Sequence, residues 1–192
     1  MKLSRLAGFA VASALFGCDA SIPAGPVPDG SRATLSLGAV VASTEGGGKA
    51  QLPPGFSKLE FSFNAKAKSD GTALGQFRQR YESAGGVVDF SGSVTCVTFD
   101  AANNRAWIGG VITANRSTNP AVLTPIHEPG RDVWFRVVDN GEGQAPDDRT
   151  TVLGFEGGGG IITSADYCAL QLWTAGDANT WAVVSGNIQV KP

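Results

Sequence analysis

The segment Leu59–Lys68, which reads LEFSFNAKAK, alternates apolar and polar residues along its whole length. Successive side chains of a β-strand point to opposite faces, so this period of two is typical of a strand with one buried face and one wet face. Asp70-Gly71 follows as a hairpin signal and predicts that Ala73–Tyr81 returns as a second strand. The apolar spacing of Ala73–Tyr81 also fits a helix, and the preceding turn favours the strand. The chain must therefore build a sheet that covers a core.

Short apolar segments continue to the end of the chain, interrupted about every ten residues by Gly, Asn, Asp or Pro. They predict an all-β fold, an antiparallel β-sandwich or barrel of about 8–10 short strands. Two glycine-rich runs, Gly46–Gly48 and Gly157–Gly160, do not match a phosphate-binding loop and are interpreted as linker or loop. The further strands are expected at Val87–Phe90, Ser93–Phe99, Arg105–Ala114, Val133–Val138, Thr151–Phe155, Ala169–Trp173 and Trp181–Val190, with a turn at Ala101–Asn104.

The N-terminus has the features of an export signal. Lys2 and Arg5 precede the uncharged run Leu6–Gly17, which is shorter than the roughly 20 residues that a membrane-spanning helix needs. The run ends at Leu15–Cys18, reading LFGC, which resembles the lipobox of bacterial lipoproteins. The resemblance implies cleavage before Cys18 and a diacylglycerol thioether on its sulfur. The alternative is ordinary secretion, with Cys18 incidental.

These features predict three parts of the chain. Residues 1–17 form a lipoprotein signal peptide, residues 18–32 form a lipid-anchored flexible tether rich in Pro and Gly, and residues 33–192 form a single β-domain. The expected location is the bacterial cell envelope, with the protein anchored to a membrane by its lipid. Without the signal peptide, the chain has 13 basic and 17 acidic residues, so a nucleic-acid partner is not expected.

The body of the chain carries two short motifs. The segment Asp132–Glu142 reads DVWFRVVDNGE, and the final segment Ser185–Lys191 contains GNIQ. Both are similar to uncharacterised exported bacterial all-β domains, which share a strand ending in VVDNGE and a last strand with GNIQ. The resemblance implies the fold and an exported location. It supplies no activity and no catalytic residue.

Three cysteines remain to be assigned. If Cys18 carries the lipid, Cys96 and Cys168 are an even pair in an oxidising compartment. We expect a disulfide between them, and the alternative is two separate buried thiols. Neither lies in a CxxC pair, so a redox or zinc role has no support.

Candidate catalytic residues are few. His127 is the single histidine, so any Ser–His–Asp mechanism must use it as the general base. It lies in a Pro-bounded loop, and no GxSxG motif occurs in the chain. A loop histidine without a chemical role is the more frequent interpretation, and the chain is not expected to be an enzyme.

One acidic segment has the residue types of a calcium site. Calcium binds six to eight oxygen ligands, but the spacing fails the EF-hand pattern. Asp and Asn also begin turns by bonding to their own backbone, so a plain acidic connection between strands is the main interpretation. The weak calcium candidates are Asp139, Asn140, Glu142, Asp147 and Asp148, and no other cofactor is expected.

The tryptophans are the most informative large side chains. Trp107, Trp134 and Trp173 alternate with aliphatic neighbours, which places them on the opposite face of their strands from the core. They either form an exposed platform for sugar rings or a partner protein, or lie under a second covering layer. The leading hypothesis is a non-catalytic, lipid-anchored module that binds a polysaccharide or an envelope protein, or acts structurally. The alternatives are a carbohydrate-binding module that uses the three tryptophans, and a secreted hydrolase built on His127.

Overall fold

The computed structural model describes residues 38–142, 147–157, 160–161, 163–172 and 179–192. The expected signal peptide, the tether with Cys18, and Trp173 lie outside the described residues, so these assignments and the proposed domain boundaries stay predictions.

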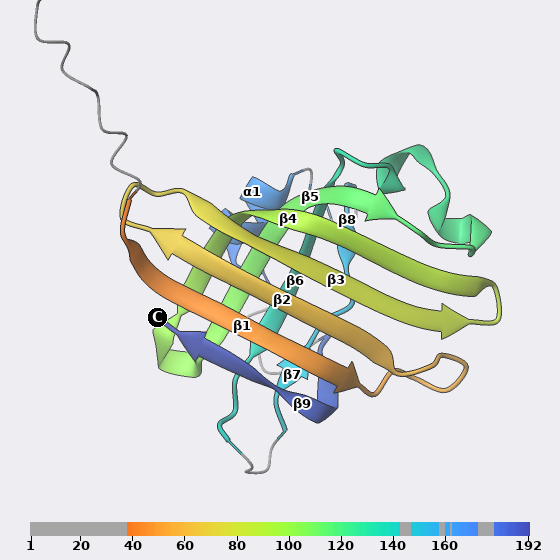
Figure 1. Cartoon of the computed structure of the whole chain (residues 1–192), viewed down its shortest axis with the longest axis horizontal. Coiled ribbons are helices and arrows are strands. Elements are labelled where there is room, and N and C mark those ends of the chain that lie inside the picture. Colours follow the sequence, from red (N-terminus) through yellow and green to blue (C-terminus); the bar gives the residue numbers. More distant parts are fainter. Residues whose placement is uncertain (1–37, 143–146, 158–159, 162, 173–178) are drawn as a thin grey trace, which may run out of the picture. The chain divides into compact units, whose positions relative to one another are not determined.

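Nine antiparallel strands and one short helix make up the regular structure of the described residues (Figure 1). Three single 3₁₀ turns lie at Ala101–Asn103, Pro120–Val122 and Pro125–His127. The strands are β1 Val40–Ala50, β2 Leu59–Lys68, β3 Ala73–Ser83, β4 Gly86–Asp100, β5 Arg105–Asn115, β6 Asp132–Val138, β7 Arg149–Thr150, β8 Gly154–Phe155 and β9 Trp181–Lys191, and the helix is α1 Ser164–Leu170.

The strands form a closed ring. Their order is β5-β4-β3-β2-β1-β9-β7-β6, β5 pairs in turn with β6, and β8 is a further partner of β6. Trp107 of β5 lies opposite Arg136 of β6 at the closing pair. The all-β prediction is confirmed. The sequence left open a sandwich or a barrel, and the closed ring corresponds to the barrel-like arrangement.

The inner face of the ring holds the main core. Along β2 the buried residues are every second one, as the alternation predicts. Phe135 of β6 makes aromatic contacts with Phe63 of β2 and Phe77 of β3, with ring centroids 5.4 and 5.7 Å apart. Gly92 of β4 leaves room for this cluster, because a Cβ there would lie 2.2 Å from the Phe77 ring. Strands from opposite sides of the ring therefore meet in one aromatic cluster.

Two of the sequence predictions for strands and loops were wrong. Gly46–Gly48, interpreted as linker or loop, lies within β1. A glycine has no side chain to show an alternating pattern, and Gly46 packs so closely that a Cβ would lie 2.7 Å from the Phe63 ring. The expected strand at Ala169–Trp173 was also wrong, because residues 169 and 170 belong to α1. Thr163 and Asp166 form a capping box that begins this helix, and the apolar pattern alone did not reveal it.

The smaller differences between the predicted and the observed strands concern their lengths. Val87–Phe90 and Ser93–Phe99 are parts of one strand, β4, whose pairing with β5 shifts register between Ser91 and Gly92 and again between Val94 and Cys96. Of the expected strand Thr151–Phe155, residues 154 and 155 alone form β8. Such register shifts are typical of β-bulges, which bend a strand and help a sheet to close on itself.

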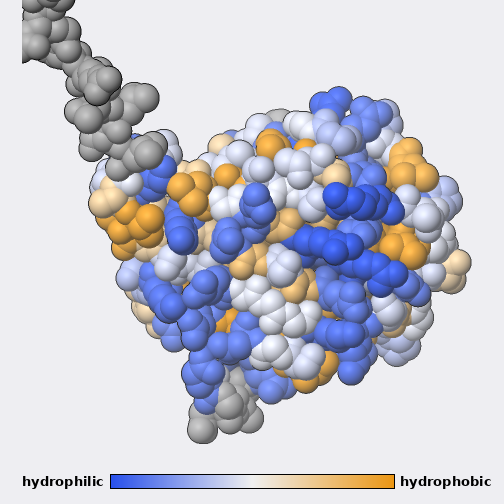
Figure 2. Space-filling view, in the orientation of Figure 1, coloured by the Kyte–Doolittle hydropathy of each residue, from blue (hydrophilic) through white to orange (hydrophobic). Residues whose placement is uncertain are grey.

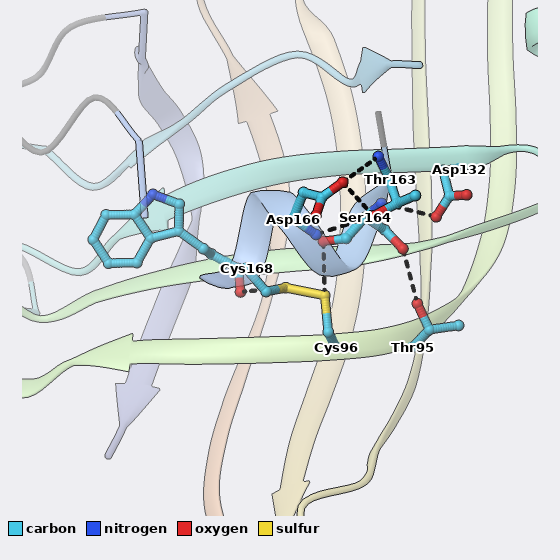
Figure 3. The surroundings of a disulfide bond; sticks show 8 residues. Thr95, Cys96, Asp132, Thr163, Ser164, Asp166 and Cys168 are labelled. Atoms are coloured by element: carbon cyan, nitrogen blue, oxygen red, sulfur yellow. Dashed lines mark hydrogen bonds between the residues drawn. A yellow bond between two sulfur atoms is a disulfide. The ribbon is translucent and has the colours of Figure 1, made fainter. Parts of the chain in front are cut away.

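Helix α1 covers the outer face of β5 and β6 and is held there by the predicted disulfide, which is confirmed. Cys96 of β4 bonds to Cys168 of α1 (Figure 3). The helix approaches the sheet at Gly109, where a Cβ would lie 2.5 Å from the Cys96 sulfur. At the first turn, the Ser164 amide donates to Asp132 Oδ1 of β6 at 2.8 Å. The helix is thus attached to two strands by one covalent bond and one charge-assisted hydrogen bond.

The disulfide should supply much of the stability of this arrangement. It closes a sequence separation of 72 residues, and the chain-entropy relation then gives about 4 kcal/mol. We expect reduction to lower the free energy of unfolding, measured in urea, by about this amount. The near-ultraviolet signal from the tryptophans beneath α1 should also become weaker. The Cys96→Ala/Cys168→Ala variant controls for the reductant, and its stability should not respond to reduction. Equal stability of the oxidised and reduced wild type would contradict the assignment.

Candidate functional site

Trp107 and Trp134 are buried, with 0% and 2% of their surface exposed. The Trp107 indole nitrogen donates to the Leu172 carbonyl at 2.9 Å, and the Trp134 ring stacks on Tyr167 of α1 at 5.7 Å. Both lie on the face opposite the main core, as the alternation predicts, but α1 and its flanking residues cover them. The exposed platform is therefore wrong for these two residues, and the covered-face alternative is correct. Trp173 lies outside the described residues.

Trp181, which the sequence analysis did not select, lines two open apolar hollows. Their volumes are about 310 and 170 Å³, and both are also lined by Val152. The larger one reaches Trp134 and Tyr167, and the smaller one reaches Phe56. Trp181 is the one tryptophan among the described residues that is not fully buried.

His127 is buried at the end of the turn Pro125–His127. Its Nδ1 lies 2.8 Å from the Thr124 hydroxyl, and its ring packs against Phe155 and Phe90 at centroid distances of 4.3 and 5.9 Å. Burial lowers the pKa of the imidazole below its ordinary value. No carboxylate bonds to the ring within the described residues, so this geometry does not assemble a Ser–His–Asp triad around His127.

The weak calcium candidates have other bonding partners. Asp148 accepts hydrogen bonds from the Asn140 amide at 2.9 Å and from the Ile188 amide of β9 at 2.7 Å. Asp139 accepts from the Val190 amide of β9 at 2.9 Å. These carboxylates satisfy N–H groups of β9 beyond its short pairing with β7, which is a structural role.

Glu142 completes this contact by accepting from the side chains of Asn187 and Gln189. Burial, the dominant cause, raises the pKa of Asp148, and the nearby Asp139 and Glu142 add to the effect. In the described part of the chain, no group of three or more His, Cys, Asp or Glu side chains is placed to hold a metal ion. The acidic connection between strands is therefore the interpretation that fits the bonding of these residues.

A further hollow, which we call the polar groove, is lined mostly by hydrogen-bonding side chains. It lies across the outer face of β2, β3 and β4, where Ser62 pairs with Arg78 and Arg78 pairs with Ser91. In Figure 2 the surface over β1, β2 and β3 is mainly blue and white, which marks residues of hydrophilic and intermediate hydropathy. The groove has a volume of about 510 Å³ and is lined by Gly46, Ser62, Phe63, Asn64, Gln76, Phe77, Arg78, Ser91 and Arg116.

Two arginines define the electrostatics of the polar groove. Arg78 bonds to both oxygens of Asp89 through Nε at 3.0 Å and Nη2 at 2.7 Å, and 8% of the Asp89 side chain is exposed. This bidentate pair holds the pKa of Asp89 below its ordinary value. Arg116 donates to the Ser91 hydroxyl at 3.1 Å and has no carboxylate within ion-pair distance among the described residues.

No sequence signal marked the polar groove, because polar residues on the wet face of a strand all fit the same alternating pattern. The groove places small residues such as Ser62 and Ser91 beside the long side chain of Arg78. These residues come together only through the register of β1–β4. Arg116 comes from the end of β5 and could not be placed beside Ser91 from the sequence.

Comparison with family models, with curated proteins and with solved structures finds no match to this chain. No helix in the described ranges has the length and apolar character of a membrane span.

The buried histidine predicts a specific pH dependence of stability. Because the pKa of His127 is lowered in the folded protein, the unfolded chain binds more protons as the pH falls through the ordinary value of 6.5. We expect the free energy of unfolding to decrease between about pH 7 and pH 5, in the range where histidine titrates. His127→Phe keeps the ring packing and should flatten this part of the profile, measured by urea unfolding at a series of pH values. Glu128→Gln, at the exposed neighbour, should keep the wild-type slope; equal slopes for all three proteins would refute the role of His127.

Proposed function

We propose that the chain is a non-catalytic binding module of the bacterial cell envelope, anchored by a lipid on Cys18, and that its ligand lies in the polar groove. The observation that carries the proposal is the groove itself, a hollow of about 510 Å³ lined by side chains that form hydrogen bonds. Ligand sites are concave and hold a few placed polar groups, and this hollow has both properties.

The rigidity of the surrounding sheet supports a binding role. The groove is built on β2, β3 and β4, which are long neighbouring strands in the closed ring. Arg78 is fixed by Asp89, and Asn64 is fixed because its Oδ1 accepts from the Gln76 amide at 2.9 Å. Side chains that are ordered before the ligand arrives lose less conformational entropy on binding. Binding on such a surface needs no chemical step.

The envelope location rests on the sequence. The resemblance of Leu15–Cys18 to a lipobox and the basic start of the chain support export and lipidation. The confirmed disulfide supports an oxidising compartment, because disulfides persist in such compartments.

The lipid anchor gives a direct test. Cells that express the full chain are labelled with radioactive palmitate, and we expect the label and membrane partition of the wild type to be lost in Cys18→Ser. Cys96→Ala/Cys168→Ala, which leaves Cys18 in place, should keep the label. Label that persists in Cys18→Ser would exclude lipidation at this residue.

Filling the groove should weaken binding. Ser62 is an exposed lining residue of the groove and Ser185 is exposed on β9 outside it, so Ser62→Trp and Ser185→Trp are matched substitutions. The full chain is run in native gels that contain neutral or carboxylated polysaccharides, including dextran and polygalacturonate. We expect at least one polymer to retard the wild type and Ser185→Trp, and Ser62→Trp to lose about tenfold or more in affinity, as the loss of one or two well-placed hydrogen bonds would give.

Two outcomes would contradict the proposed site. Retardation of Ser62→Trp equal to that of the wild type would place binding outside the groove. Absence of retardation by every polymer would remove the polysaccharide as the ligand of this module.

A further inference from the structure

We infer that the polar groove binds a polysaccharide that carries carboxylate groups, and that Arg116 makes the charge-selective contact. This inference rests on the proposed function and specifies the ligand of the same site. It follows from the unused hydrogen-bonding groups of the groove, from its local charge, and from its open shape.

Several donors in the groove are unused, beside acceptor oxygens such as those of Ser62 and Gln76. Arg78 uses Nε and Nη2 for Asp89 and keeps Nη1, while Arg116 uses Nη1 for Ser91 and keeps Nη2. The Asn64 carbonyl oxygen is occupied by the Gln76 amide, which leaves the Asn64 side-chain N–H groups. A guanidinium group has no acceptor atoms. A ligand that supplies acceptors, as carboxylates do, therefore matches the free donors of Arg78, Arg116 and Asn64.

The local charge is positive although the chain as a whole is acidic. Asp89 interacts electrostatically with both groove arginines, but it is nearly buried and forms its ion pair with Arg78. Two other acidic side chains of β2 and β3 are also paired, since Glu60 contacts Lys49 at 2.9 Å and Glu82 contacts Arg80 at 2.6 Å. Arg116 lies beside this neutralised set with its charge unpaired among the described residues. An anion would gain both Coulomb energy and hydrogen bonds there.

The shape of the groove favours a polymer over a small enclosed anion. Its lining residues Ser62, Asn64, Gln76 and Arg78 are exposed on the outer face of the sheet, and the hollow is open to solvent along that face. An open polar groove can hold successive sugar units, whose hydroxyls pair with serine and amide side chains.

Other polyanions fit less well. The aromatic residues of the lining, Phe63 and Phe77, are buried, so no exposed ring in the groove can stack on a nucleic-acid base. The groove likewise exposes no large apolar side chain that could insert into an anionic lipid surface.

The test uses one polymer backbone in two charge states. Binding of the full chain to polygalacturonate and to its fully methyl-esterified form is measured by native gel retardation with a chelator present. We expect the wild type to bind the acid form about tenfold or more tightly than the ester, since one charge-assisted contact distinguishes them. Raising the salt concentration from about 0.05 to 0.3 M should weaken binding to the acid form and leave the ester nearly unaffected.

Substitutions at Arg116 identify the contact. Arg116→Gln should lose about tenfold in affinity for the acid form and little for the ester, and Arg116→Lys should keep part of the preference because it keeps the charge. Arg131→Gln is the matched control, because Arg131 is an exposed arginine outside the groove. It should bind like the wild type.

The outcomes separate the two proposals. If the wild type binds acid and ester equally and Ser62→Trp abolishes both, the groove is a site for neutral saccharides and the charge selectivity is wrong. If Ser62→Trp binds polygalacturonate like the wild type, the groove itself is wrong as the site. Tighter binding to polyphosphate than to polygalacturonate would overturn the carboxylate assignment in favour of a phosphate ligand.

Discussion

The pairing of β5 with β6 is the constraint on which the rest of the structure depends, because it closes the sheet on itself. Trp107 opposite Arg136 and Arg105 opposite Val138 belong to this pairing. Closure gives every strand an inside and an outside, so one alternating pattern fills the core with Phe side chains and leaves the outer face polar. It also reduces the open edges at which sheets associate with other chains.

The outer face then has two different parts. Over β5 and β6, the side chains of Trp107 and Trp134 would be an exposed apolar surface, and α1 covers them through the Cys96–Cys168 disulfide. The outer side chains of β2, β3 and β4 that line the groove are mainly polar and need no cover. The polar groove is therefore available for a ligand, because the covering helix lies over β5, β6 and the part of β4 that carries Cys96, where the large aromatic side chains lie.

Much of the fold could be predicted from sequence, because period-two alternation depends only on backbone geometry. The segment Leu59–Lys68 is β2 with the bounds that its pattern indicated. The glycine run Gly46–Gly48 was misassigned because glycine carries no pattern. Helix α1 was missed because its signal was a capping box at Thr163 and Asp166 within an apolar stretch that resembled a strand. The candidate site was harder to predict, because Trp107 and Trp134 are buried and the groove residues have no distinctive spacing.

The sequence by itself determined that the chain is an all-β protein and acidic overall, and it predicted that Cys96 and Cys168 pair, with two separate thiols as the alternative. These properties follow from local geometry, cysteine number and total charge. Only the tertiary structure decided which polar residues become neighbours. Strand register places Ser62 beside Arg78 and Arg78 beside Ser91, and the end of β5 brings Arg116 to the same point. A contact between residues far apart in the chain depends on how the sheet closes, and local sequence patterns do not encode that closure.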